Sequence, residues 1–303
     1  MLFDNVIYQH EQNFIFKKNF FLNAKYGRFG NNIQQAALAS MFANKYKVNV
    51  YVKNLEYIEP FKIVHSRLSS FFRFSRNSSS RFFFFGSKKN INFTPDEPLL
   101  IEDFDYYQEN FYDSIRLFVK PNIQFLKEIN IDPNILVVHI RGFSKENPNG
   151  NHPDYLQNPL VYYRKLLSNF EKTLVVTDND RTSIIKLLKD EFNVKVQSTS
   201  IKNDFNTLIS AKNLATSGVG TFSISAAIIS DSLKNLFFSN LYLDRHLNPN
   251  MIHGGVNKFE FKILNYLSYG DWDVNNNNLE TILHNHKEIL IPDLFRKKFS
   301  NIQ

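Results

Sequence analysis

The chain contains no cysteine among its 303 residues. This absence excludes disulfide frameworks, zinc sites built on thiolates and cysteine nucleophiles, and it fits a reducing compartment. Long apolar runs are also missing, since the longest one, residues 82–85, is far shorter than the roughly 20 residues that span a bilayer. The N-terminus carries Asp4 and lacks the apolar core of a signal peptide. We therefore expect a cytoplasmic protein.

Acidic residues are missing from one stretch, residues 61–89. The formal net charge is +7, from 36 Lys and Arg against 29 Asp and Glu. Without the cations of this stretch, 29 Lys and Arg remain and balance the acids. Those cations are Lys62, Arg67, Arg73, Arg76, Arg81, Lys88 and Lys89. The net charge therefore belongs to one basic, phenylalanine-rich insertion and not to the whole chain.

Phenylalanines alternate with arginines in this basic insertion, and that mixture favours an anionic membrane surface. We expect peripheral contact with the inner face of a membrane through residues 61–89. A solvated loop is the plainer alternative. A nucleic-acid partner, suggested by the pI near 9.3, would leave the strand-end motifs described below unexplained, so no nucleic acid is expected.

Strand-like and helix-like patterns alternate along both halves of the chain. In the first half, strands at 20–26 and 48–52 flank a helix at 31–45. In the second half, we expect strands at 135–141, 173–178, 194–197 and 213–217, with helices at 161–170, 181–192, 204–211 and from about 225. Such alternation predicts an α/β fold with doubly wound sheets. The length suits two Rossmann-like domains facing a cleft.

The expected domain boundary lies after residue 122. The first domain, residues 1–122, carries the basic insertion, which we extend to 61–95 and expect to be a long loop or a broken helical excursion. The second domain, residues 123–303, ends in an expected helical tail.

A glycine-containing turn, residues 27–32, separates the first strand from its helix. Glycine permits a tight turn, and a helix N-terminus presents free N–H groups. Gly30, Asn31 and Asn32 are therefore candidate ligand-binding residues. A helix cap with no ligand is the alternative, since the spacing matches neither a dinucleotide nor a P-loop fingerprint.

His139 and Arg141 end the apolar run at 135–141. Ligands of open α/β sheets bind outside the carboxyl ends of strands, so both are candidate catalytic residues. The guanidinium of Arg141 offers a bidentate fork that suits a pyrophosphate. Alternatively, Arg141 pairs with a structural carboxylate and His139 packs in the core.

Hydroxyls, glycines and a following helix make a second phosphate-binding pattern later in the chain. Its candidate residues are Gly220, Thr221, Phe222 and Ser223. Asp204 stands at an expected helix start and is a further candidate for donor binding. Asp is also a favoured N-cap, so capping is the alternative role of Asp204.

No metal site is expected. Asp178 and Asp180 match the letters of a DxD motif, but their position after a strand favours a capped turn before the next helix. Candidates for a general base are Glu146, His152 and Asp154, all in the polar stretch 142–159.

Four segments, in order, resemble the fucosyltransferase superfamily, most closely the bacterial α-1,2-fucosyltransferases. Residues 27–52 resemble the opening GxGNxxxQ segment of these enzymes, and residues 105–118 look like their later Tyr-Gln-Ser-Phe region. Residues 137–141, VVHIR, resemble the superfamily's H-x-R motif. Residues 203–227 are similar to the segment that runs from an acid to a serine-rich turn.

The resemblance implies a metal-independent, inverting glycosyltransferase of the two-domain GT-B type. It would transfer fucose or a related sugar from a GDP-sugar donor to a hydroxyl of a glycan or a lipid-linked glycan, with no other cofactor. Arg141 would hold the pyrophosphate, with His139 near the ribose or base. Asp204 would read the base, and Thr221 and Ser223 would bind phosphate.

The chain departs from the family at the H-x-R-R-G-D motif, where it reads His139-Ile140-Arg141-Gly142-Phe143-Ser144. The second Arg and the Asp are absent. Two alternatives follow: the same fold with a different nucleotide-sugar donor, or a non-catalytic relative that binds glycan or nucleic acid.

Overall fold

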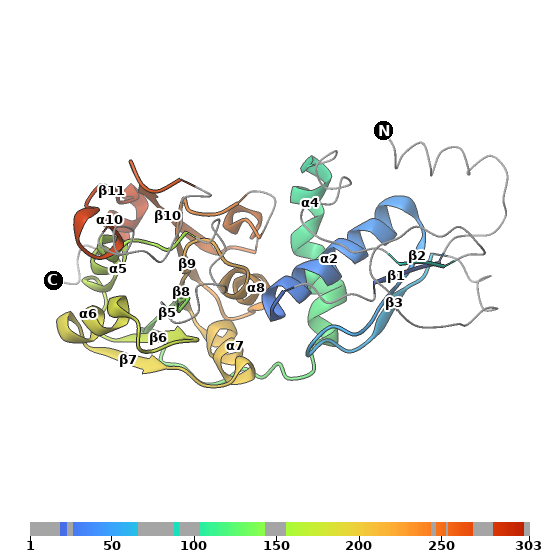
Figure 1. Ribbon diagram of the computed structural model, residues 1–303, viewed down its shortest axis with the longest axis horizontal. Helices are drawn as coiled ribbons and strands as arrows, with labels where there is room; N and C mark the ends of the chain where they lie inside the picture. Colours follow the sequence, from blue (N-terminus) through green and yellow to red (C-terminus); the bar gives the residue numbers. More distant parts are fainter. Residues whose placement is uncertain are drawn as a thin grey trace. The chain divides into compact units, whose positions relative to one another are not determined.

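The chain folds into two compact units, Met1–Phe125 and Leu126–Gln303, each of which is considered by itself (Figure 1). The sequence-based boundary after residue 122 lies close to this division. The computed structural model describes residues 19–22, 27–65, 88–90, 104–142, 156–243, 247–252, 254–268 and 281–299. Within those residues, no helix has the length and apolar character needed to cross a membrane.

The first unit contains a four-stranded sheet in the order β3-β2-β1-β4. Its strands are β1 (Asn19–Leu22), β2 (Asn49–Val52), β3 (Phe61–Ile63) and β4 (Lys88–Asn90). Both β2 and β4 run parallel to β1, whereas β3 is antiparallel to β2. Helix α2 (Phe29–Tyr46) connects β1 to β2, which makes a βαβ unit, as the alternating pattern predicts.

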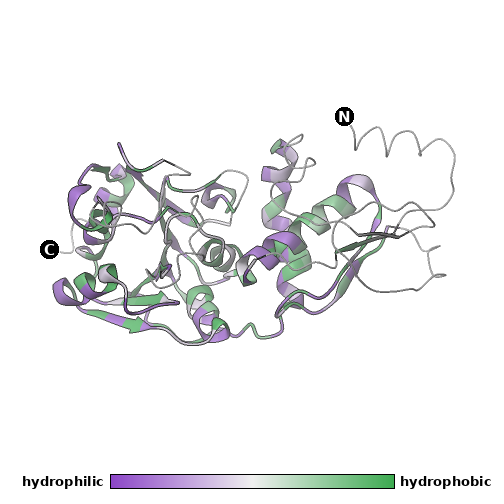
Figure 2. Cartoon of the chain, in the orientation of Figure 1, coloured by the Kyte–Doolittle hydropathy of each residue, from purple (hydrophilic) through white to green (hydrophobic). Residues whose placement is uncertain are grey.

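Helix α2 is buried along most of its length. Its start is hydrophilic and its middle is apolar, from Ala36 to Ala43 (Figure 2). It packs against α4 (Phe104–Ser114) and the π-helical turn Ile115–Val119 that continues α4. A short 3₁₀ turn, Lys120–Asn122, follows. The helix ends where Lys47 adopts a left-handed conformation with φ 50°.

The stretch 61–95, expected to be a long loop or a broken helical excursion, instead contains two strands, β3 at Phe61–Ile63 and β4 at Lys88–Asn90. Strand β3 is short and pairs with β2. Its side chains alternate in burial, with Ile63 buried and Lys62 exposed. Residues 66–87, which hold Arg67, Arg73, Arg76 and Arg81, lie outside the described residues. The expected membrane contact therefore stays a prediction.

The second unit contains a seven-stranded mixed sheet in the order β11-β10-β9-β8-β5-β6-β7. Its parallel strands are β5 (Leu136–Ile140), β6 (Thr173–Thr177), β7 (Val194–Gln197), β8 (Asn213–Ala215), β9 (Asn235–Ser239) and β10 (Asn257–Ile263). The last strand, β11 (Ile289–Leu290), is antiparallel. Counted along the chain, the six parallel strands have the order 3-2-1-4-5-6 of a Rossmann domain.

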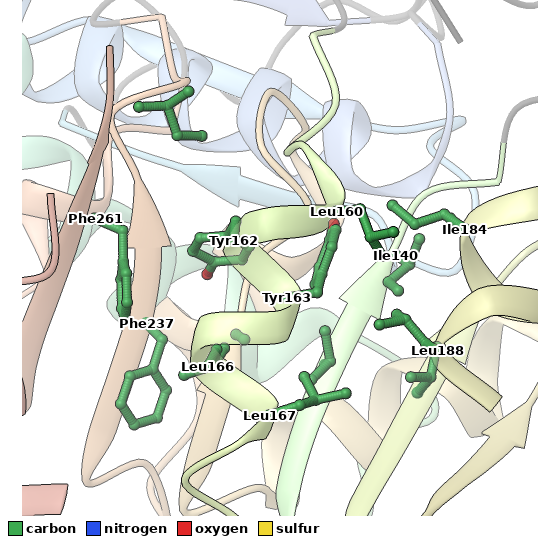
Figure 3. Packing of buried hydrophobic residues seen from close by; sticks show 14 of the residues in the cluster. Ile140, Leu160, Tyr162, Tyr163, Leu166, Leu167, Ile184, Leu188, Phe237 and Phe261 are labelled. Carbon is green, nitrogen blue, oxygen red and sulfur yellow. The ribbon is translucent and has the colours of Figure 1, made fainter. Parts of the chain in front are cut away.

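Helices cover both faces of this sheet, as expected for a doubly wound fold. On one face, Val138 and Ile140 of β5 pack against α5 (Leu160–Leu167) and α6 (Ser183–Glu191), as Figure 3 shows around Ile140. The intervening residues Val137 and His139 point to the other face. That face is covered by α7 (Ile201–Ser210) and α8 (Phe222–Ile229).

The expected helical tail instead contributes three strands, β9, β10 and β11, and ends in the short helix α10 (Asp293–Phe299). Strand β10 alternates, with Phe259, Phe261 and Ile263 buried. Phe259 and Phe261 pack against Phe295 of α10, with ring centroids 5.9 Å and 5.1 Å apart. The tail is therefore part of the core of the second unit.

Three asparagines form a ladder across the amino ends of the parallel strands. Asn213, Asn235 and Asn257 are in register on β8, β9 and β10. Asn235 Nδ2 donates to Asn213 Oδ1 at 2.7 Å, and Asn257 Nδ2 donates to Asn235 Oδ1 at 3.0 Å. Lys298 Nζ of α10 also donates to Asn235 Oδ1, at 2.8 Å. The central amide therefore serves three partners.

Replacement of Asn235 by alanine should lower the free energy of unfolding by about 2 kcal/mol, because partly buried donors and an acceptor lose their partner. Asn257→Ala, at the exposed end of the ladder, should cost about 0.5 kcal/mol. Urea denaturation followed by circular dichroism measures both variants. Equal losses for the two variants would contradict the central role of Asn235.

Candidate functional site

The order of the parallel strands reverses between β5 and β8. From β5 the chain moves outward to β6 and β7, and then returns to the other side of β5 with β8. Loops that follow the two strands at such a point diverge to opposite faces of the sheet, which leaves room for a ligand at the carboxyl ends. The candidate site is therefore the group of residues that follow β5 and β8.

His139 is the penultimate residue of β5 and is 7% exposed. Its ring lies against Phe222 of α8, with centroids 5.4 Å apart, and its Nδ1 has no hydrogen-bond partner among the described residues. Burial lowers the pKa of His139 to about 4; the charge of Asp178 opposes this shift, and that of Arg141 adds to it. His139 is therefore a neutral imidazole at pH 7.

This depressed pKa makes stability depend on pH. Between pH 6.5 and 4 the unfolded chain binds a proton at His139 that the folded chain does not, so stability falls as the pH falls through that window. The His139→Gln variant lacks this group. From pH 7.5 to 4.5, wild type should lose about 2–3 kcal/mol more unfolding free energy than the variant. Urea denaturation at both pH values gives the comparison, and equal losses would contradict a neutral His139.

Gly142 and Asp178 join the ends of β5 and β6. The Gly142 N–H donates to Asp178 Oδ1 at 2.5 Å. A Cβ at Gly142 would lie 2.4 Å from Asn179 Cβ and 2.9 Å from the Asn179 backbone nitrogen, so only glycine fits. Arg141, just before this contact, is half-buried. The backbone of Arg141 is thus held in place because the neighbouring Gly142 lies against the residues that follow β6.

A turn follows β6 as expected, but the side-chain bonds within it come from Thr177 and Asn179, and the N-cap of α6, Thr182, makes no side-chain capping bond. Thr177 Oγ1 accepts from the Asn179 N–H at 3.2 Å, and Asn179 Oδ1 accepts from the Arg181 N–H at 3.1 Å. Helix α6 begins two residues later. Among the described residues, no three His, Asp or Glu side chains gather as they would around a metal ion.

The glycine turn, residues 216–221, links β8 to α8. Helix α8 begins at Phe222, three residues earlier than expected, so Phe222 and Ser223 belong to its first turn. The Thr221 side chain makes no capping bond, and the first turn carries no acid. The first N–H groups of a helix have no intrahelical acceptor, so this end of α8 presents donors and a positive dipole end.

Two buried serine hydroxyls accompany these N–H groups. Ser217 and Ser223 are 0% and 1% exposed, and within the described part of the chain neither Oγ has a hydrogen-bond partner. Ser217 Oγ lies beside Gly220, 3.5 Å from where a Cβ would stand. Each of these two hydroxyls keeps a free O–H donor next to the N-terminus of α8, so both can donate to a ligand with acceptor oxygens.

Asp204 lies in the first turn of α7 and is not its N-cap. The N-cap is Ser200, which accepts from the Asn203 N–H, so the capping alternative is wrong. The Asp204 carboxylate accepts from Gln197 Nε2 at 2.8 Å and from Thr199 Oγ1 at 2.6 Å, as well as from the Thr199 N–H. It therefore fastens the end of β7 to α7, which leaves little of its acceptor capacity for a base.

The first-unit candidates lie at the start of α2. Gly30 is buried in the first helical turn, Asn31 is half-buried and Asn32 is 0% exposed. Asn32 Nδ2 donates to the carbonyl oxygens of Arg28, at 2.8 Å, and Gly27, at 3.4 Å. Asn32 thus closes the turn before the helix.

The general-base candidates Glu146, His152 and Asp154 lie outside the described residues. The structure adds two groups that the sequence did not indicate. Ser217 belongs to an expected strand, and only the early end of β8 frees it for the turn. Residues 156–158, at the end of the polar stretch, form a bridge to the glycine turn; their Leu-Gln-Asn sequence carries no signal for this role.

Comparisons with family models, with curated protein sequences and with solved structures found no match for the chain.

Proposed function

We propose that the protein is a metal-independent glycosyltransferase of the GT-B type, whose second unit binds a nucleotide-sugar donor. One observation carries the proposal. At the reversal of strand order, the residues after β5 supply Arg141, and the residues after β8 supply a helix N-terminus with two unpaired buried hydroxyls. Fixed cationic and N–H donors of this kind suit a pyrophosphate.

The chemistry proposed for this site is a displacement at the anomeric carbon. An acceptor hydroxyl oxygen forms a bond to that carbon, while the bond to the diphosphate oxygen breaks and both electrons leave with the nucleoside diphosphate. Arg141 and the α8 N-terminus stabilise the charge that develops on the leaving group. The proton of the acceptor hydroxyl passes to a general base. His139, with a pKa near 4, is too weak for this role.

A neutral His139 suits a hydrogen bond to the donor ribose or diphosphate. Ring nitrogens of a neutral imidazole act as one donor and one acceptor, and Nδ1 has no partner in the described residues. The family resemblance favours a GDP-sugar such as GDP-fucose and a glycan acceptor. The carboxylate contacts of Asp204 support a positioning role more than base recognition.

A thermal-shift panel tests donor binding. It compares GDP, UDP, CMP and dTDP and their sugars, with NAD and AMP as controls. A ligand at a hundred times its dissociation constant should stabilise the second unit by about 2.7 kcal/mol. We expect one nucleoside diphosphate and its sugar to stabilise the protein in the absence of metal. No stabilisation by any of them would overturn the proposal.

The strand order also favours a second candidate, a dinucleotide-binding domain, because 3-2-1-4-5-6 is the order of such domains. The chain after β5 reads His139-Ile140-Arg141-Gly142 and lacks the GxGxxG turn that approaches a dinucleotide pyrophosphate. Stabilisation by NAD alone in the same panel would favour this candidate.

A further inference from the structure

We propose that residues 156–158 form a clamp that positions the glycine turn for phosphate binding, with Asn158 as its main positioning residue. This inference rests on the proposed donor site and assigns a role to a segment outside that site's direct contacts. The clamp lies just before α5, and all three of its residues are buried.

The clamp pairs with the turn through its backbone. The Val219 N–H donates to the Leu156 carbonyl oxygen at 3.0 Å, and Gln157 forms an isolated antiparallel bridge with Gly218. The Gln157 carbonyl oxygen accepts from Tyr266 Oη at 2.9 Å, which ties the clamp to the chain after β10. The glycine turn is therefore held from outside its own loop.

The Asn158 side chain adds a second attachment, in the interior. Its Nδ2 donates to the Thr216 carbonyl oxygen at 3.0 Å, and its Oδ1 accepts from Ser239 Oγ at 2.5 Å. Ser239 Oγ in turn accepts from the Leu241 N–H at 3.2 Å. A chain of hydrogen bonds thus runs from the end of β9 through Asn158 to the first residue of the glycine turn. Asn158 itself is 0% exposed.

This attachment affects phosphate binding because the glycine turn that begins at Thr216 leads directly into α8, whose first N–H groups are the proposed donors. Donors that recognise a phosphate must be held within about 0.5 Å of their working positions by supporting contacts. The clamp contacts the turn at Thr216, Gly218 and Val219, so it supplies part of that support. The structure therefore assigns Asn158 to positioning, with no contact to the ligand.

Asn158→Ala and Asn235→Ala form a matched pair for the test. Both remove a buried amide from the second unit, one at the carboxyl ends of the strands and one in the asparagine ladder at their amino ends. We expect comparable losses of thermal stability. Only Asn158→Ala should weaken GDP or UDP binding by calorimetry, by tenfold or more. Ser239→Ala, which removes the anchor of Asn158, should weaken binding about threefold.

Hydrogen exchange supplies a readout that needs no ligand. In Asn158→Ala, the amides of Val219 in the turn and Ser225 in α8 should exchange at least tenfold faster, with the β5 and β6 amides unchanged. Asn235→Ala should leave the Val219 and Ser225 amides unchanged. If wild type binds the nucleotide but Asn158→Ala shows unaltered exchange at the turn or unaltered affinity, the clamp proposal is wrong and the donor-site proposal is retained. Absence of wild-type binding would overturn the donor site, and faster turn exchange would still show the clamp's positioning contact.

Discussion

Arg141→Ala is expected to lower the rate of sugar transfer by at least about a hundredfold and to weaken nucleoside diphosphate binding. Arg141 follows β5 at the point where the strand order reverses, and its guanidinium keeps its charge at any working pH. Loss of this cation leaves the helix N-terminus as the remaining partner for the departing diphosphate. The measurement is donor turnover at saturating donor, with the melting temperature as a check on folding.

Two further variants sharpen this prediction. Arg141→Lys keeps the charge but loses the bidentate fork, so an intermediate loss of about tenfold is expected. Arg164→Ala removes an arginine of the same unit that pairs with Glu191 on the surface, and its turnover should change less than twofold. Near-normal turnover in a folded Arg141→Ala protein would contradict the assigned role.

Gly218→Ala is expected to lower the free energy of unfolding by about 3 to 4 kcal/mol. Gly218 has φ +87°, a conformation that L-residues avoid at a cost of about 1–2 kcal/mol. Its Cβ would also lie 2.6 Å from the Leu156 carbonyl oxygen, and overpacking against backbone adds about 1–3 kcal/mol. Either the clamp or the glycine turn must move, so nucleotide affinity should fall with stability.

Two other glycines separate the contributions to this loss. Gly255 has φ +78° but open space around its Cβ position, so alanine there should cost only about 1–2 kcal/mol. Gly220, in the glycine turn itself, has Ser217 Oγ at 3.5 Å as its nearest neighbour, so alanine should change stability by about 0.5 kcal/mol or less. Chemical denaturation should rank the losses as Gly218, Gly255, Gly220, and a loss for Gly218→Ala no larger than that for Gly255→Ala would contradict the close contact with residues 156–158.

Several elements of the second unit could be predicted because their signals are local. Strands β5 and β6 are apolar runs, and α6 is amphipathic, so each appeared within two residues of its observed bounds. The pairing order could not be predicted in the same way. Register contacts such as Leu136 with Asn213 join residues far apart in the chain, and no local pattern determines which strand lies beside which.

Helix starts were predicted less well because capping residues competed. Ser200 and Asp204 both suit a helix start, and the chain uses the earlier one, since Asp204 then reaches back to Thr199. Helix α8 starts without a side-chain cap at all, so no cap signal marked Phe222. Strands β9 and β10 were missed: β9 is a run of only five residues, and between the two strands the described residues form only the 3₁₀ turn Pro249–Met251, so the strand–helix alternation is lost there.

The candidate site could be predicted only in part for a related reason. His139 and Arg141 stand at the end of an apolar strand, where sequence alone indicates a ligand. The supporting groups are different: Asn158 and Ser217 are ordinary polar residues until the fold brings residues 156–158 beside the glycine turn.

A backbone amide titration by NMR with GDP, and with UDP in parallel, tests most directly whether a nucleotide binds where β5 and β8 diverge. The predicted result is a saturable shift of the amide signals of Gly142, Ser223 and Ile224 with one of the two nucleotides. Saturation without any change at these three amides, or with changes confined to α2 of the first unit, would contradict the account.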